Sequence, residues 1–168
     1  VNLPPCIQIS CGCFCTMCVT EDGLVYLFGN TIGNQDECFY LPTIIEYLQD
    51  VQFIECVERY AFCKTKNNEI YCWGSNDCGQ LGLGNLDLQI TPVQCTSLLN
   101  EDIVDIKCST NHTLALNSKG EVLSCGGDSY RQTENTKLSL FTKIEDLPEI
   151  IRIECGAYHS MCIDINNN

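Results

Sequence analysis

Short segments in which apolar and polar residues alternate recur along the whole chain. This period of two is typical of β-strands that bury one face. Before residue 50 the segments are 7–12, 14–20 and 24–29, and the last two are joined by a tight turn at Glu21-Asp22-Gly23. A polar stretch over 30–41 is expected to be a loop. A fourth segment, 42–48, begins with Pro42, and proline at the start of a strand is typical of an edge strand.

The same order of segments returns further along the chain. The second copy has strands expected at 51–57, 60–65, 70–74 and 92–96 with a loop over 75–91, and the third has strands at 103–109, 112–117, 121–126 and 141–146 with a loop over 127–140. A fourth copy begins at residue 150 and ends after two strands. No segment fits a helix of normal length. The pattern predicts one all-β repeat domain over 1–168, with repeats at approximately 6–50, 51–102, 103–149 and 150–168.

Equivalent positions in the copies show what each position requires. Gly23, Asn68 and Gly120 share a turn position, and these residue types tolerate a left-handed backbone. Ile9, Ile54, Ile106 and Ile153 share a strand position that we expect to face the core. Phe28, Trp73 and Cys125 share an aromatic position, with Trp73 expected in the core. Gln35, Gln80 and Gln132 follow in the next loop, where the side-chain amide is expected to bind backbone groups of that loop.

The cysteines and histidines are interpreted as structural residues. The chain has 15 cysteines, and Cys56, Cys108 and Cys155 share one repeat position with Cys11. Recurrence at one position favours reduced cysteine packed as a small apolar side chain, with disulfides or a metal site as the alternatives. Reduced thiols predict a cytoplasmic or nuclear location. His112 and His159 also share a position, which favours a donor that links neighbouring strands over a catalytic base.

Composition and charge exclude several classes of protein. Hydrophobic residues make up 45% and charged residues 18% of the chain, which argues against disorder. No apolar run approaches the roughly 20 residues that span a bilayer, so membrane insertion is not expected. The formal net charge of −13 repels phosphate backbones, so direct nucleic-acid binding is not expected and a charged partner should be basic. No nucleophile, phosphate-binding or metalloprotease motif is present, so we predict no catalytic residues, no metal and no cofactor.

Three segments carry a resemblance to a known family. They are Trp73-Gly74-Ser75-Asn76-Asp77-Cys78-Gly79-Gln80-Leu81-Gly82, His112-Thr113-Leu114-Ala115-Leu116 and Cys155-Gly156-Ala157-Tyr158-His159-Ser160. They resemble the repeat of the regulator of chromosome condensation family, although Val57 and Ser109 replace the usual glycine and Cys125 replaces the tryptophan. The resemblance implies a β-propeller of four-stranded antiparallel blades, seven in a complete ring. About half of such a ring is present. Further repeats in a longer chain, a second copy that closes the ring, or a short open stack of blades are the three alternatives.

The same resemblance implies a function in protein recognition. The founding member of the family is a nucleotide-exchange factor for the small GTPase Ran, and other members are interaction modules, some of them in ubiquitin ligases. We therefore expect a protein-interaction module that binds a small GTPase or a basic protein surface. The alternatives are an exchange factor for a Ran- or Rab-type GTPase and the substrate-recruiting propeller of a larger ubiquitin ligase. The expected binding residues are the acidic, polar and aromatic residues of the loops, namely Asp36, Glu37, Phe39, Tyr40, Asn76, Asp77, Asn85, Asp87, Asp128, Tyr130 and Arg131.

Overall fold

The structure is a computed structural model that describes residues 3–32, 34–127 and 138–168, without the side chains of 31, 34–37 and 138. The described part is built of strands, and its single helical segment is the 3-10 turn η1 (Thr96–Leu98). No helix in these ranges is both long and apolar enough to cross a bilayer. The strands are β1 (Cys6–Cys11), β2 (Cys15–Thr20), β3 (Val25–Thr31), β4 (Asn34–Ile44), β5 (Val51–Val57), β6 (Tyr60–Thr65), β7 (Ile70–Gly74), β8 (Gln89–Gln94), β9 (Ile103–Cys108), β10 (His112–Asn117), β11 (Val122–Gly126), β12 (Leu138–Lys143), β13 (Ile150–Cys155) and β14 (Ser160–Asp164).

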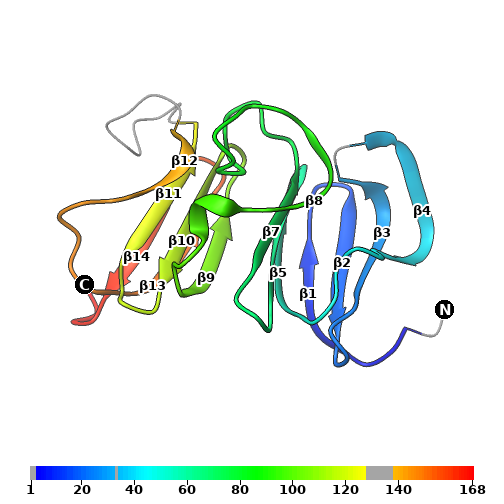
Figure 1. The fold of residues 1–168 in the computed structure, drawn as a ribbon, viewed down its shortest axis with the longest axis horizontal. Coiled ribbons are helices and arrows are strands. Elements are labelled where there is room, and N and C mark those ends of the chain that lie inside the picture. Colours follow the sequence, from blue (N-terminus) through cyan, green and yellow to red (C-terminus); the bar gives the residue numbers. More distant parts are fainter. Residues whose placement is uncertain (1–2, 33, 128–137) are drawn as a thin grey trace. The chain divides into compact units, whose positions relative to one another are not determined.

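Consecutive strands pair antiparallel and form three four-stranded sheets and one two-stranded sheet (Figure 1). Their orders are β1-β2-β3-β4, β5-β6-β7-β8, β9-β10-β11-β12 and β13-β14. The predicted all-β fold class of four-stranded antiparallel sheets is therefore confirmed, and the bounds of the repeats stay a prediction. The chain divides into two compact units, Val1–Ser75 with Leu88–Gln94, and Asn76–Asp87 with Cys95–Asn168.

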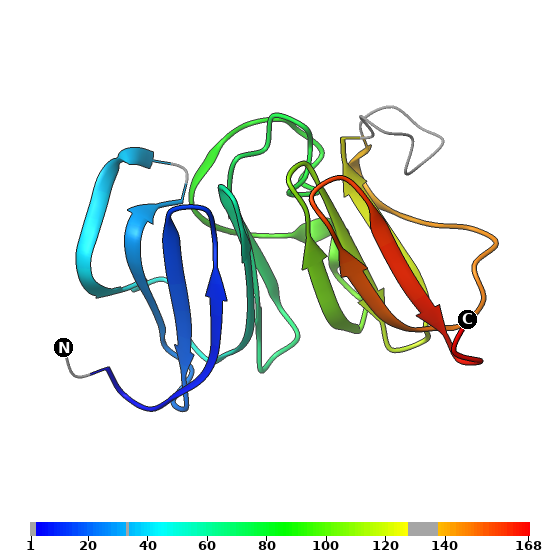
Figure 2. The ribbon, with the colours of Figure 1, turned by 180° about the vertical axis from the view of Figure 1, so that it is seen from behind.

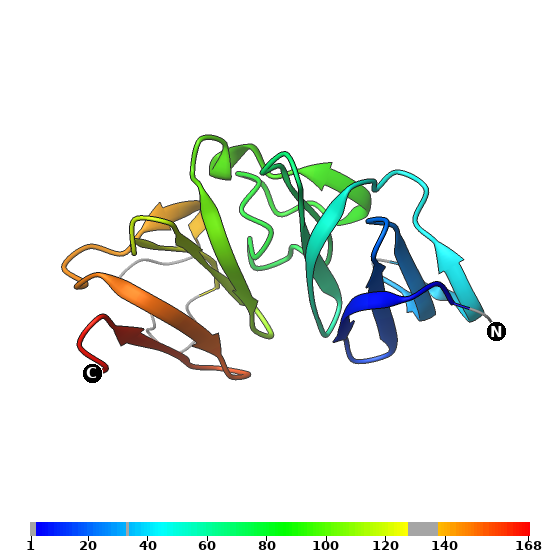
Figure 3. The same ribbon diagram turned by 90° about the horizontal axis from the view of Figure 1, so that it is seen from below.

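The first unit contains the first two sheets, and β1 lies beside β5 (Figure 3). Its core includes Met17, Val19 and Val25 from the first sheet and Ile54 and Trp73 from the second. All of these side chains are almost fully buried. Trp73 thus lies in the core, as the repeat pattern predicted.

The second unit contains the last two sheets. In Figure 2 the hairpin of β13 and β14 is seen next to β9 and β10, and β13 contacts both of these strands. Leu114, Leu116 and Val122 pack there against Ile150 and Ile153. The two-stranded sheet is therefore attached to its neighbour by an apolar core of its own.

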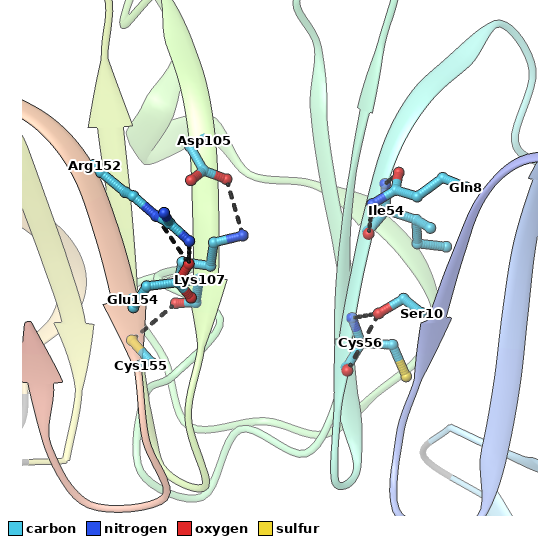
Figure 4. Close-up of polar contacts among 9 residues, drawn as sticks. All are labelled: Gln8, Ser10, Ile54, Cys56, Asp105, Lys107, Arg152, Glu154 and Cys155. Carbon is cyan, nitrogen blue, oxygen red and sulfur yellow. Dashed lines mark hydrogen bonds and ion pairs between the residues drawn. The ribbon is translucent and has the colours of Figure 1, made fainter.

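Side chains of β1 bind the backbone at the edge of β5 (Figure 4). The Gln8 carboxamide donates from Nε2 to Ile54 O at 2.8 Å and accepts at Oε1 from Ile54 N at 2.9 Å. One step along, Ser10 Oγ accepts from Cys56 N at 2.9 Å and donates to Cys56 O at 3.4 Å. Because β5 is the first strand of its sheet, these groups have no strand partner on that side. The two side chains supply what a fifth strand would supply.

The equivalent contact in the second unit uses different chemistry. Asp105 and Lys107 occupy the positions of Gln8 and Ser10, and they form an ion pair with each other at 3.4 Å (Figure 4). Cys155 donates from Sγ to Lys107 O at 3.5 Å, and Ser109 Oγ donates to Ala157 O at 2.7 Å. His112 Nε2 lies 2.7 Å from Ser160 Oγ. Hydroxyl, thiol and imidazole groups thus connect these two sheets.

A glycine lies at or near the end of the third strand of each four-stranded sheet and has a conformation that only glycine adopts easily. Gly29, Gly74 and Gly126 have φ of 96°, 106° and 107°. A Cβ at each would overlap the carbonyl oxygen of Phe14, Arg59 and Asn111 respectively, and the amide that follows each glycine donates to that same oxygen. The turn position is also confirmed, because Gly23, Asn68 and Gly120 have φ of 82°, 62° and 78°.

The predicted start of each outer strand was wrong. The segment expected as a loop over 30–41 belongs to β3 and β4, and β8 and β12 begin before 92 and 141. Phe39 packs against the core of the first unit and its segment pairs with β3, so tertiary contacts outweigh the low strand propensity of Asn, Asp and Glu. Pro42 and Pro92 lie inside edge strands, where the register shifts, instead of at their starts.

The prediction that Ile9 faces the core was also wrong. Ile54, Ile106 and Ile153 are 0–1% exposed, whereas Ile9 is 65% exposed. Ile54 packs in the core that the first two sheets share, while the face of β1 that carries Ile7 and Ile9 has no sheet against it in the described chain. Burial at this position depends on a neighbouring sheet and not on the strand itself.

No disulfide joins any of the 15 cysteines in the structure. Eight are buried, namely Cys15, Cys18, Cys56, Cys63, Cys72, Cys95, Cys108 and Cys125, while five are exposed: Cys6, Cys11, Cys13, Cys38 and Cys162. Burial raises the pKa of the Cys63 thiol to about 12. A hydrogen bond with Cys56, whose Sγ lies 3.5 Å away, lowers the pKa of Cys15. Packing as a small apolar side chain therefore explains about half of the cysteines, whereas the five exposed cysteines lie on the surface.

Replacing Gly126 by alanine should lower the free energy of unfolding by about 2–4 kcal/mol, because a left-handed backbone costs about 1–2 kcal/mol and the new Cβ overlaps Asn111 O. Gly84→Ala is the matched control: its φ is also positive, at 80°, but its nearest neighbour would be Leu140 Cδ2 at 3.2 Å. Urea denaturation measures both variants. Equal losses of unfolding free energy in the two variants would contradict a steric overlap between the new Cβ and Asn111 O.

Replacing Gln8 by leucine should cost about 1–3 kcal/mol, because Ile54 N–H and C=O lose their partners at the edge of β5. Gln52→Leu, at an exposed position of the same edge strand, should change stability by less than about 0.5 kcal/mol. The two variants are compared by their denaturation midpoints. A loss in Gln8→Leu no larger than in the control would show that the edge does not need this amide.

Alkylation with iodoacetamide at about pH 8 should label Cys13 at least about tenfold faster than Cys63, since the buried thiol is protonated and inaccessible. Peptide mass mapping measures the rates. The raised pKa of Cys63 also makes the stability of the fold depend on pH. The contribution of the protonated Cys63 thiol to the free energy of unfolding is complete below the ordinary thiol pKa of 9.0, and it is lost as the pH rises towards about 12. Equal labelling rates of Cys13 and Cys63 would contradict the burial of Cys63.

Candidate interaction surface

The loop between β7 and β8 is held in place by its own side chains. Asn76 is 1% exposed; its Nδ2 donates to Asn85 O at 3.0 Å and its Oδ1 accepts from Leu81 N at 3.0 Å. Gln80 is 2% exposed, and its Oε1 accepts from Cys78 N at 2.9 Å. The Gln80 side chain therefore binds a backbone group of its own loop, in the way expected for this repeat position.

The same loop is anchored on neighbouring strands of the second unit. Gln80 O accepts from Thr113 Oγ1 at 2.8 Å and from Cys125 Sγ at 3.3 Å. Ser97 Oγ donates to Gly82 O at 2.6 Å, and the Leu81 side chain is fully buried. The loop with the most regular repeat sequence is thus used almost entirely to build the fold.

A few side chains of this loop reach the surface. Asp77, Asn85 and Asp87 are exposed, and so is Leu86 at 47%. Asn85 Oδ1 accepts from Asn76 Nδ2 and from Asp87 N, which fixes its orientation. Two carboxylates and two leucines, Leu86 and Leu88, therefore reach the surface from this hydrogen-bonded loop, while Asn76 does not.

The other expected binding residues of the first unit lie in β4 and not in a loop. Tyr40 is 92% exposed, and Phe39 is partly buried against the core. Leu41 and Tyr47 nearby are 62% and 79% exposed. The side chains of Gln35, Asp36 and Glu37 lie outside the described part, as do the residues Asp128, Tyr130, Arg131 and Gln132.

The two histidines have different surroundings. His112 is buried and contacts Ser160 as described above, whereas His159 is exposed. Cys155 Sγ lies 3.9 Å from His112 Nε2, and His112 Nδ1 lies 3.4 Å from Asn111 Oδ1. Cys155 also links β13 to β9, and His112 links β10 to β14. The arrangement therefore connects the two sheets of the second unit, in keeping with a structural histidine.

A cleft of about 300 Å³ opens in the first unit between β3 and β4 on one side and β7 and β8 on the other. Ile32, Phe39 and Trp73 form its apolar floor, and Glu46, Tyr47 and Ile90 stand at its rim. Ile32 and Trp73 are only 4% and 2% exposed, while Tyr47 and Ile90 are 79% and 63% exposed. The cleft therefore joins the buried core to an exposed aromatic and aliphatic rim.

Among the side chains that the structure describes, Glu46 is the only charged one that lines the cleft. It is exposed, and no basic residue lines the cleft beside it. Among residues 3–32, 34–127 and 138–168, no three His, Cys, Asp or Glu side chains are grouped to hold a metal ion. The chemistry available at the cleft is burial of apolar groups together with attraction of a cation at the rim.

The sequence did not point to most residues of this cleft. Tyr47 and Ile90 are single large apolar residues, and their exposure becomes evident only when the outer strands are placed. Trp73 was assigned to the core alone, although one side of it also lines the cleft. The available signal was the position of Ile90 two residues before Pro92, because proline marks an edge strand; no comparable signal marks Tyr47.

Two profiles described as "Regulator of chromosome condensation (RCC1) repeat" match the chain. One matches residues 67–116, and the other matches residues 51–80 and 103–132. Mouse serine/threonine-protein kinase Nek9 is 29% identical over 137 residues, which are 74% of this chain and 14% of Nek9. Mouse E3 ubiquitin-protein ligase HERC2 is 30% identical over 171 residues, which are 92% of this chain and 4% of HERC2. The chain therefore spans a small part of the length of these relatives.

Solved structures with the same fold are propellers of this type. Yeast RCC1 (Prp20) in complex with Kap60 superposes with a TM-score of 0.85 at 22% identity, over 99% of this chain and 43% of that chain. Prp20p from Saccharomyces cerevisiae, in a structure reported with its binding to Gsp1p and histones, gives a TM-score of 0.82 at 23% identity, over 99% and 44%. The two matches of the second profile begin at residues 51 and 103, where β5 and β9 begin. The chain is therefore built of regulator of chromosome condensation (RCC1) repeats, and its sheets are blades of the β-propeller type.

Proposed function

We propose that this chain is a protein-interaction module that binds its partner through exposed aromatic and acidic side chains of the outer strands and loops. The observation that carries the proposal is the contrast within these segments. Asn76, Gln80 and Leu81 are buried for folding, whereas Tyr40, Asp77 and Asp87 point to solvent from well-held backbone. Exposed aromatic side chains on a rigid support are typical of protein-binding surfaces.

The charge of the chain favours a basic partner. The formal net charge of −13 attracts positive surfaces and speeds encounter with them at low salt. The relatives support the class of partner, since Prp20 was solved bound to Kap60, and its binding to Gsp1p and histones is reported with its structure. A protein partner with a basic surface, such as a histone or a small GTPase, fits both observations.

A second candidate function is nucleotide exchange on a small GTPase. It is favoured by the likeness to Prp20, whose binding to Gsp1p is reported with its structure. Recruitment of substrates for a ubiquitin ligase is the third, favoured by the likeness to a segment of HERC2. Exchange differs from simple binding because it must lower the affinity of the GTPase for its nucleotide.

Pull-down from a cell extract, compared between the native chain and two surface variants, tests the interaction function. Tyr40→Ser on β4 and, separately, Asp87→Lys in the loop after β7 should each weaken recovery of specific partners by about threefold to tenfold. Glu145→Lys, an exposed charge reversal outside these segments, is the control. Raising the salt concentration should weaken binding in the same direction as Asp87→Lys. An identical set of partners with all variants would contradict the proposal.

Release of fluorescent GDP from a panel of Ran- and Rab-type GTPases separates binding from exchange. A pure interaction module leaves the release rate unchanged at saturating concentration, whereas an exchange factor accelerates it by orders of magnitude. Acceleration would replace the first proposal by the second.

A further inference from the structure

The cleft lined by Trp73 points to a specific kind of partner segment. We propose that it docks an extended segment of a partner protein that inserts one large apolar side chain over Ile32, Phe39 and Trp73 and places a neighbouring Lys or Arg against Glu46. This inference rests on the proposed interaction function and specifies its chemistry. It concerns the first unit alone, because every residue that lines the cleft belongs to that unit.

The size and floor of the cleft favour a side chain over a larger ligand. A volume of about 300 Å³ lies at the lower end of the range found for ligand pockets, which suits one or two side chains. The floor is apolar, and a large aliphatic or aromatic side chain buried there gains roughly 1.5–3 kcal/mol. Tyr47 and Ile90 at the rim would cover the inserted group from two sides.

The charge at the rim of the cleft selects which residue of the partner segment stands beside the inserted apolar side chain. Glu46 lines the cleft with no basic residue beside it, so an anionic segment would meet repulsion and a cationic one attraction. An Arg or Lys could also lie on the exposed ring of Tyr47. A second copy of this chain is a poor occupant, because its own net charge is −13.

Recognition by side-chain insertion is favoured over addition of a strand. β4 and β8, which border the cleft, are the outer strands of their sheets and would be the sites of strand addition. Each contains a proline, Pro42 and Pro92, at a shift in register. Proline lacks an amide donor and interrupts the ladder that an added strand would need.

Selection of short random peptides on the immobilised chain tests the proposal. Enriched peptides should contain a Lys or Arg within two residues of a Phe, Leu, Ile, Met or Trp. The selected peptides, made synthetically, should bind the native chain about tenfold more tightly than the Glu46→Arg variant. Glu21→Arg, an exposed charge reversal outside the cleft, should bind like the native chain.

Two further measurements locate the binding site. Trp73 is the only tryptophan, so its fluorescence should change and saturate as the selected peptide fills the cleft. Tyr47→Ala should weaken binding by about tenfold, while Tyr158→Ala, which removes an exposed tyrosine outside the cleft lining, should not. Thermal unfolding confirms that each exposed variant is folded.

Several outcomes would overturn the inference. The first is enrichment of acidic or purely apolar peptides, and the second is peptide binding that does not depend on Glu46 and Tyr47. The third is self-association of the chain, measured by light scattering, that Tyr47→Ala abolishes. That result would make a second copy of the chain the occupant of the cleft. The proposed function is judged separately. If Tyr40→Ser or Asp87→Lys removes protein partners while the cleft variants bind peptides as the native chain does, the module function stands and the cleft inference fails.

Discussion

The backbone at the inner edge of each sheet needs partners that its own sheet cannot provide, and the rest of the architecture depends on how that need is met. At β5 the Gln8 carboxamide donates to and accepts from Ile54 and so substitutes for a peptide group of a missing strand. At β9 and β13 an ion pair occupies the equivalent positions, and Cys155, Ser109 and His112 make the connections instead. Neighbouring sheets are thus joined by side chains in both units, although the side chains and the backbone groups that they bind differ.

What the sequence could predict was set by backbone geometry within one repeat. The turn at Gly23, Asn68 and Gly120 requires positive φ, which few residue types tolerate, so the residues alone revealed it. The same holds for the number of strands and their order. Ile9 shows the limit: its residue type matches Ile54, but a side chain is buried only if another sheet covers it, and that information lies outside the repeat. The start of the outer strand β4 was missed because its first residues have low strand propensity and depend on pairing with β3.

The candidate site was harder to predict than the fold for a related reason. The most regular segment, from Trp73 to Gly82, attracts attention as a motif, yet Asn76, Gln80 and Leu81 are buried and bonded within the fold. Residues that repeat at fixed positions do so because each blade has the same structural need. Residues that face a partner have no such need, so Tyr47, Ile90 and Glu46 show no periodic signal. Their common feature, a shared cleft, appears only when two neighbouring sheets are placed together.

This separation explains why the fold alone does not identify the partner. Prp20 shares the architecture at 22% identity, so the same fold forms although most residues differ. The outer strands carry fewer such requirements, because one of their edges faces solvent, and their side chains can change without loss of the sheet. In the first unit those strands border an apolar cleft with the acidic residue Glu46 at its rim. The specificity of the module should therefore reside where its repeats differ from one another, while its stability resides where they agree.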